Sequence, residues 1–357
     1  MLPNHDSIRE QFPFLKKFIY FDSAHYTPYP QRTVKKLNEF ITTFTEDHLN
    51  LSLFHLNKSK ELRETCGKLI NAPAEDIIIT SNTTHGINIF ANGVQLNQNE
   101  KNVAVLDSEF PAVVYPWLNR EKLGQATVML IPSDKGYANE AVIKRALMDY
   151  NIKVFTISYV QFLGYRHNIK SLSDFCRKRN ILLVVDAIQA TGVCPVDVLE
   201  MGIDYLSTGN QKWLMSPAGL GFTYISKKYR EYISPSYAGT MNVNFDFDNF
   251  LNYQLDFKET GEAYENSTPN TLAMIGTDEA IKYFLELGVE NIYNHIIDIQ
   301  DKLIEKLDKT KYRIESDLSP EHRSNILIFT HADLQRNKEI QKSLEKKNIY
   351  IALREGY

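Results

Sequence analysis

The sequence predicts an α/β protein in which a mostly parallel β-sheet lies between helices, followed by a smaller α+β region. Short apolar segments rich in β-branched residues alternate with amphipathic helical segments over the larger, first part of the chain. Continuous apolar strands of this kind are typical of parallel sheets that are buried on both faces. After Gly261 the pattern changes to longer helical segments followed by isolated strands.

The elements of the first region are predicted from their periodicity. A helix is expected over residues 31–45, where apolar side chains recur every three or four residues. Strands are expected at 77–80, 103–106, 128–131, 154–157 and 181–185, and further helices at 139–150 and 171–179. No internal repeat interrupts this alternation.

The second region is expected to form a smaller domain. Helices are predicted at 273–287 and 289–307, then a strand at 325–329, another helix, and a final strand at 349–353. We place the boundary near Phe257. The large domain then comprises residues 20–257, and the small domain combines residues 1–19 with 258–357.

Composition excludes several classes of protein. The net charge of -4 and the lack of a run of Lys and Arg give no basic surface for nucleic acid. The apolar runs are too short to span a membrane, and the first residues do not resemble a signal peptide. Cys66, Cys176 and Cys194 are odd in number and lack metal-type spacing, so neither disulfides nor a metal site is expected. A reducing cytoplasm is the expected compartment.

Asp186 ends the apolar run 181–185. Doubly wound sheets bind ligands at the carboxyl ends of their strands, and a buried Asp needs a cationic partner. An Asp that caps the next helix is the alternative.

Lys212 follows in a segment of small polar and Gly residues between two predicted strands. A Lys in this position could form a Schiff base, although most loop lysines are solvated surface charges.

The predicted strand at 77–80 runs into Ser81-Asn82-Thr83-Thr84 and then into a helix. Hydroxyl groups and free backbone N–H groups at a helix N-terminus are suited to binding phosphate. The alternative is an ordinary Thr helix cap.

Together these segments resemble the class V aminotransferase family of fold-type I pyridoxal-phosphate (PLP) enzymes, which includes cysteine desulfurases and isopenicillin N epimerase-like proteins. The resemblance begins at Tyr20-Phe21-Asp22-Ser23-Ala24 and runs to the last residue. Its most specific stretch, 158–225, contains an Asp-Ala-x-Gln element at Asp186 and a Gln-Lys-Trp element at Lys212, in the family's order and spacing. The resemblance implies a large PLP-binding domain with a smaller α+β domain.

The resemblance also implies roles for single residues. Lys212 would hold PLP as a Schiff base and then act as general base on the substrate, while Asp186 would keep the pyridine nitrogen protonated. The other cofactor-binding residues it implies are Gln189 at the ring hydroxyl, Thr83, Thr84 and Gln211 at the phosphate, Phe110 stacked on the ring, Gln161 over the cofactor, and Thr268 donated to the phosphate by the neighbouring subunit. A homodimer with a shared active site is therefore implied. Core packing is the alternative for Phe110.

The sequence departs from the family pattern in places. Asn82 replaces a favoured Gly, His85 replaces an acid, and Gly209 stands where desulfurases have a phosphate-binding Ser, for which Thr208 could compensate. The sequence stops at Tyr357, where relatives continue with a strand bearing the Arg that binds the substrate carboxylate. Arg354 and Arg166 are candidates for that role; the alternative is that each is an ordinary exposed arginine on a loop.

Within the family the sequence favours an aminotransferase acting on an amino acid or related amine, a small-molecule substrate. Cysteine desulfurases need an accessible thiolate, and none of the three cysteines falls in a matching region, although one such position would lie just past Tyr357. Gln211-Lys212-Trp213 and Glu109-Phe110-Pro111 look more like the epimerase and aminotransferase-like branch. Racemisation or epimerisation and desulfurase or lyase chemistry stay open, as does a catalytically inactive binding protein. The lack of a G-x-G-x-x-G after the first strand disfavours a Rossmann-type nucleotide enzyme.

Overall fold

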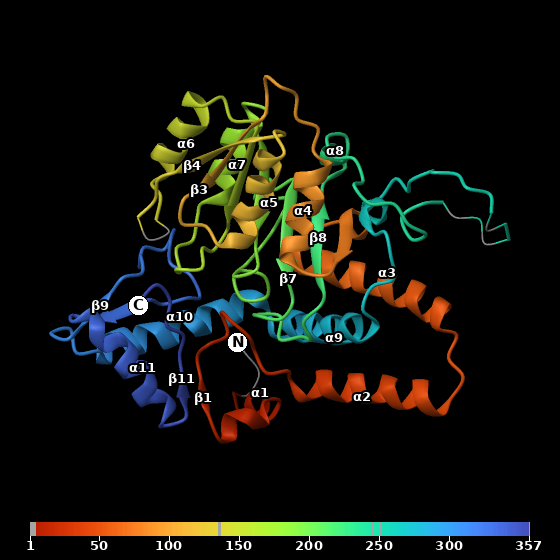
Figure 1. The fold of residues 1–357 in the computed structure, drawn as a ribbon. Helices are drawn as coiled ribbons and strands as arrows, with labels where there is room; N and C mark the ends of the chain where they lie inside the picture. The colour runs from red at the N-terminus through yellow and green to blue at the C-terminus, as the bar shows by residue number, and fades with distance from the viewer. Residues whose placement is uncertain (1–4, 135–136, 245, 247, 250, 357) are drawn as a thin grey trace.

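A seven-stranded sheet forms the centre of the computed structural model, which describes residues 5–356 except 135–136, 245, 247 and 250 (Figure 1). Its strand order is β2-β8-β7-β6-β5-β3-β4. The strands are β2 (Ile77–Thr80), β3 (Asn102–Leu106), β4 (Thr127–Ile131), β5 (Val154–Ser158), β6 (Leu182–Asp186), β7 (Tyr205–Gly209) and β8 (Gly221–Ile225). Strand β8 is antiparallel to both its neighbours, and the other pairs are parallel. The predicted mostly parallel α/β sheet is confirmed.

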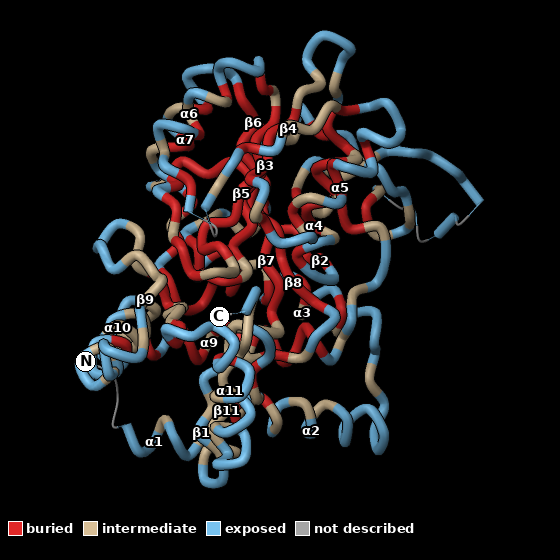
Figure 2. Tube along the Cα trace, turned by 60° about the vertical axis from the view of Figure 1, so that its left-hand side comes forward, coloured by how far each residue is buried: buried red, intermediate tan, exposed pale blue. Residues whose placement is uncertain are grey.

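Each face of the sheet is covered by its own hydrophobic core. One core joins Phe155, Leu183 and Phe222 of the sheet to α3, α6, α7 and α9. The other joins Val105 and Val184 to α4, α5 and α8. These helices are α3 (Leu51–Ile70), α4 (Thr83–Gly93), α5 (Pro111–Lys122), α6 (Glu140–Asp149), α7 (Ile169–Arg177), α8 (Lys227–Arg230) and α9 (Thr271–Leu287). Figure 2 shows the buried residues concentrated along the strands.

The remaining elements lie around this centre. Helices α1 (His5–Glu10) and α2 (Gln31–Glu46) belong to the N-terminal part, and α10 (Val289–Lys306) and α11 (Asn337–Glu345) to the C-terminal part. Helix α2 packs on α9 and lies at the periphery in Figure 1. Strand β1 (Ile19–Tyr20) pairs in parallel with β11 (Ile349–Tyr350), and β9 (Tyr312–Ile314) pairs with β10 (Phe329–His331). The pairing of β1 with β11 joins the N-terminal and C-terminal parts of the chain.

Most predicted elements are confirmed to within two residues, and two predictions for the C-terminal part are wrong. Residues 325–328 are not a strand; β10 begins at Phe329. In the segment before β10, the Asn325 side chain donates to the Gln189 carbonyl at 3.0 Å. The Ile328 N–H donates to the Ser316 hydroxyl at 2.7 Å, and the Ile328 carbonyl accepts from the Glu315 N–H at 2.9 Å. The final strand ends at Tyr350 instead of residue 353.

The sequence analysis did not identify α3. Its apolar residues do not form one stripe, because Leu62 and Cys66 are buried while Leu53 and Leu56 are exposed. The boundary near Phe257 stays a prediction. In the described part of the chain, no helix combines the length and apolar character needed to cross a membrane.

Candidate PLP site

Asp186 is the last residue of β6 and lies at the edge of the sheet where parallel strands end. Its exposed fraction is 3%, and the Ile188 N–H donates to its Oδ1 at 2.9 Å. No hydrogen bond to Oδ2 is found among the described residues. Burial raises the pKa of Asp186 to about 6, against the opposing effects of the Ile188 N–H and the Lys212 charge. The carboxylate is therefore anchored through one oxygen, and the other can pair with a cation.

Lys212 lies between β7 and β8 and is half-buried. Burial lowers its pKa; the Asp186 and Asp22 carboxylates oppose this effect, and Arg354 adds to it. The amine and the Asp186 carboxylate, which the sequence places on different elements, therefore lie close enough to influence each other's charge. A lower pKa leaves more of the amine neutral at physiological pH, which is the form that attacks a carbonyl and accepts a proton.

Phe110 lies directly before α5, beside the Lys212 amine. Nζ of Lys212 is 5.5 Å from the centroid of the Phe110 ring, and Phe162 contacts that ring edge-on with centroids 5.9 Å apart. Phe110 keeps an exposed fraction of 46%, so the alternative of core packing is wrong for this residue. Its ring is free to contact a flat ligand beside Lys212.

Polar side chains gather at the N-terminus of α4. Thr83 begins the helix, and the Asn82 side chain caps it by accepting from the His85 N–H at 2.8 Å. Thr83 Oγ1 is buried and has no hydrogen-bond partner among the described residues. A Cβ atom on Gly209 would lie 3.2 Å from Thr83 Oγ1 and 2.8 Å from Gln211 Oε1. An unpaired buried hydroxyl at a helix N-terminus, beside a Gly that leaves space, fits a phosphate group.

The other predicted residues are placed as follows. Gln189 accepts from the Trp213 Nε1–H at 2.8 Å and donates to the Ala24 carbonyl at 3.1 Å, which leaves one amide N–H for another acceptor. Gln161 is buried, accepts from the Leu163 N–H at 2.6 Å and donates to the Ser108 carbonyl, so it links the turns after β5 and β3.

Thr84 and Thr268 are both exposed, the first in the opening turn of α4 and the second on the loop before α9. The ligand roles of these residues stay predictions.

Asp22 and Arg354 were not assigned to the cofactor site from the sequence. Asp22 lies two residues after β1, and Arg354 lies four residues after β11. Arg354 Nη2 is 3.8 Å from Asp22 Oδ1. Burial raises the pKa of Asp22, although Arg354 and His25 oppose this effect. Arg166, the other arginine considered, lies over the Tyr293 ring at 5.5 Å. Only the pairing of β1 with β11 places Arg354 near Lys212, and a two-residue strand gives little signal in a sequence.

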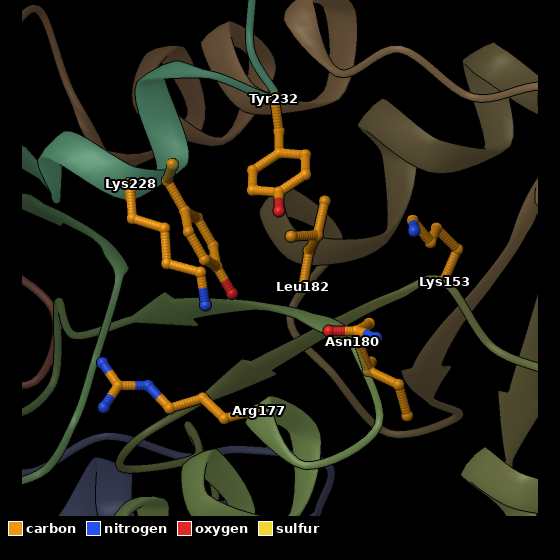
Figure 3. A pocket seen from close by; sticks show the side chains of 8 residues that line it. Lys153, Arg177, Asn180, Leu182, Lys228 and Tyr232 are labelled. Carbon is orange, nitrogen blue, oxygen red and sulfur yellow. The ribbon is translucent and has the colours of Figure 1, made fainter.

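A small pocket lies at the other end of the strands (Figure 3). It is formed by residues that precede β5 and β6 together with α8, whereas Asp186 ends β6. Its volume of about 30 Å³ accommodates little more than one water molecule. Its Arg177 pairs with Asp204 at 3.1 Å, and its Lys153 Nζ lies 3.7 Å from Glu100. No group of three or more metal-binding side chains occurs in the described residues.

A comparison with protein families identifies the class of protein. The model of the family Aminotransferase class-V matches residues 19–357. The chain belongs to this family. Its members are PLP-dependent enzymes of fold-type I, so the predicted cofactor and fold class are confirmed.

The chain is also similar to individual proteins. A probable cysteine desulfurase of Borreliella burgdorferi is 29% identical over 90% of this chain and 80% of the relative. An uncharacterized aminotransferase of Schizosaccharomyces pombe is 25% identical over 97% of this chain and 88% of the relative.

Among solved structures, a C-DES mutant with glycine covalently linked to the PLP cofactor superposes with a TM-score of 0.89 at 20% identity, over 99% of this chain and 92% of that chain. The apo cysteine desulfurase of Thermococcus onnurineus NA1 gives a TM-score of 0.86 at 21% identity, over 98% of this chain and 88% of that chain. At these identities the structures support the fold alone.

Proposed function

We propose that this chain is a PLP-dependent aminotransferase of an amino acid or related amine, in which Lys212 is both the covalent anchor of the cofactor and the base that moves the substrate's proton. One observation carries the proposal: the Lys212 amine and the Asp186 carboxylate converge in one buried region, where each affects the pKa of the other. Bound PLP supplies an electron-accepting ring that stabilises negative charge at the substrate's α-carbon.

Different residues of the site would bind different parts of PLP. Lys212 would bind the aldehyde carbon, and Asp186 Oδ2 would pair with the protonated pyridine nitrogen. Phe110 would cover one face of the ring. Thr83 would donate its unpaired hydroxyl to the phosphate; Thr84 and Gln211, and Thr268 of a partner subunit, would complete that set. Gln189 would reach the ring hydroxyl with its remaining N–H, and Gln161 would lie over the cofactor.

Proton transfer is the step that the protein itself performs. With the substrate bound to PLP, the Lys212 amine would be free to accept the α-proton and to deliver it to another atom. Burial helps because it lowers the pKa of Lys212, so the freed amine is more often neutral. The atom to which Lys212 delivers the proton would decide the outcome: delivery to the α-carbon from the other side would give racemisation or epimerisation, and delivery elsewhere would allow transamination.

Cysteine desulfurase or C–S lyase activity is the second candidate, and the names of the relatives favour it. A desulfurase needs a thiolate that accepts sulfur. Cys66, Cys176 and Cys194 are all buried, and burial raises the pKa of each thiol. These three residues are therefore poor sulfur acceptors. All three being unpaired supports a reducing, cytoplasmic location.

The proposal is tested with protein reconstituted with PLP. Borohydride should fix the cofactor on a peptide containing Lys212, and Lys212→Ala should abolish turnover. Incubation with a panel of amino acids should yield α-keto acids from a subset of them. Alanine with sulfide from cysteine would instead support the desulfurase, and racemised products would support the epimerase. A protein that takes up no PLP would refute the proposal.

A homodimer is part of the proposal. Helices α2 and α3 expose the apolar side chains Ile41, Phe44, Leu53 and Leu56, each with an exposed fraction above 45%. The rings of Phe40 and Phe44 stack with centroids 5.8 Å apart, and Phe40 contacts Phe54 at 5.0 Å, so the apolar surface continues from one helix to the other. Surfaces of this kind usually bind another protein. Light scattering should give twice the chain mass, and Phe44→Glu should shift it towards the monomer.

A further inference from the structure

Glu109 is a second buried carboxyl group near the end of the sheet that carries Asp186. It lies in the turn between β3 and α5, with an exposed fraction of 7%. Ser158 donates to both of its oxygens, from the backbone N–H to Oε1 at 2.8 Å and from the hydroxyl to Oε2 at 2.6 Å. These two bonds fix the carboxyl group against the end of β5.

The register of the sheet places this group next to Asp186. Ser158 on β5 and Asp186 on β6 are paired residues of parallel strands. Paired residues direct their side chains to the same face, and neighbouring strands lie about 4.8 Å apart. Thr156, two residues earlier on that face, accepts from the Trp117 Nε1–H of α5 at 2.8 Å. The face is therefore the one that α5 covers, and Glu109, Ser158 and Asp186 follow one another across it.

The charges around Glu109 form a connected set. Burial raises the pKa of Glu109 to about 7; the Ser158 donors oppose this effect and the Asp186 carboxylate adds to it. Lys212 in turn acts on Asp186, and Arg354 and Asp22 act on Lys212. Above neutral pH the Glu109 and Asp186 side chains are therefore both carboxylates, and Lys212 is the cation that acts on Asp186.

We propose that Glu109 is a positioning residue for PLP: its carboxylate, held by Ser158, reinforces the pairing of Asp186 with the protonated pyridine nitrogen. This inference rests on the proposed function. A second negative charge close to the ring nitrogen favours the protonated form of that nitrogen. A substitution that removes the Glu109 charge but keeps the shape of the side chain should therefore lower the pKa of the pyridine nitrogen.

The experiment uses holoenzyme carrying PLP labelled with ¹⁵N at the pyridine nitrogen. In Glu109→Gln the side-chain carbonyl can accept from the Ser158 N–H, and the amide can donate to the hydroxyl, so the change removes charge without removing both contacts. The ¹⁵N chemical shift, followed from pH 7 to 10, should move towards that of unprotonated pyridine, with any titration midpoint about one pH unit lower than in the native enzyme.

Two further variants complete the test. Asp107→Asn removes an exposed carboxylate from the same turn and should leave the shift unchanged. Ser158→Ala keeps the Glu109 charge but frees it from one bond, and should give a smaller change in the same direction; it serves as the test if Glu109→Gln does not fold. The inference is overturned if the ¹⁵N shift of the variant that folds equals the native one at every pH. Failure of native protein to take up PLP on Lys212 would instead refute the proposed function.

Discussion

Replacement of Asp186 by Asn should make the cofactor-free protein more stable while it impairs the enzyme. The pKa of the buried carboxyl group is about 6, against a usual value of 3.8, mainly because burial disfavours its charge. Each pH unit between these values corresponds to about 1.4 kcal/mol, so the ionised side chain costs the folded protein about 3 kcal/mol. Asn keeps an oxygen for the Ile188 N–H and carries no charge.

The sign of the pH dependence follows from linkage. The folded carboxyl group binds its proton more tightly than the unfolded one, so stability falls as the pH rises from about 4 to 6 and then levels off. Asp186→Asn and native protein should therefore be equally stable below about pH 4, and the variant should gain up to about 3 kcal/mol above pH 7. Loss of the Asp186 charge also lowers the pKa of Lys212 further, which offsets part of this gain.

Thermal unfolding of the apoprotein at a series of pH values measures this difference. At pH 8 the variant should unfold several degrees higher than the native protein. Addition of PLP should reverse the order, because only the native carboxylate can pair by charge with the ring nitrogen, and turnover of the variant should fall by orders of magnitude. A variant that is no more stable than native protein at pH 8, or whose advantage is the same at pH 4, would refute the reasoning.

Two other substitutions test the structure around the site. Thr83→Val removes a buried hydroxyl that has no partner among the described residues, so the apoprotein should be as stable or slightly more stable, while the PLP dissociation constant should rise about 10-fold or more. Thr33→Val, at another such hydroxyl, is the control and should leave PLP affinity unchanged. Equal PLP affinities in both variants and the native protein would contradict the phosphate role of Thr83. Arg63→Met removes the cation that pairs with the buried Glu265 and leaves that carboxylate only the Ile79 N–H. The free energy of unfolding, measured in urea at pH 8, should fall by about 3 kcal/mol, and the loss should be smaller at pH 5. A loss that does not depend on pH would contradict this account.

The sequence alone predicted the parts of the site that depend on local patterns. The end of an apolar run and a segment of small residues between two strands drew attention to Asp186 and Lys212, and the resemblance of the Asp-Ala-x-Gln and Gln-Lys-Trp elements to the family assigned their roles. Glu109 received no role, since its importance comes from Ser158 on another strand. Asp22 and Arg354 come from opposite ends of the chain and meet only through the pairing of β1 with β11. Periodicity locates elements, whereas these contacts depend on which elements become neighbours.

The same burial acts in opposite directions on the two central groups. It raises the pKa of Asp186 and lowers that of Lys212, so the folded apoprotein disfavours both charges that the pair would carry in water. A bound PLP would relieve both penalties, since its ring nitrogen gives Asp186 a cation and its aldehyde carbon converts the amine into part of the cofactor. Thr83, whose buried hydroxyl also has no partner in the described part of the chain, would gain an acceptor in the phosphate. Three groups that destabilise the apoprotein would thus increase its affinity for one ligand. For this reason the stability of the apoprotein and its affinity for PLP should change in opposite directions in Asp186→Asn and Thr83→Val.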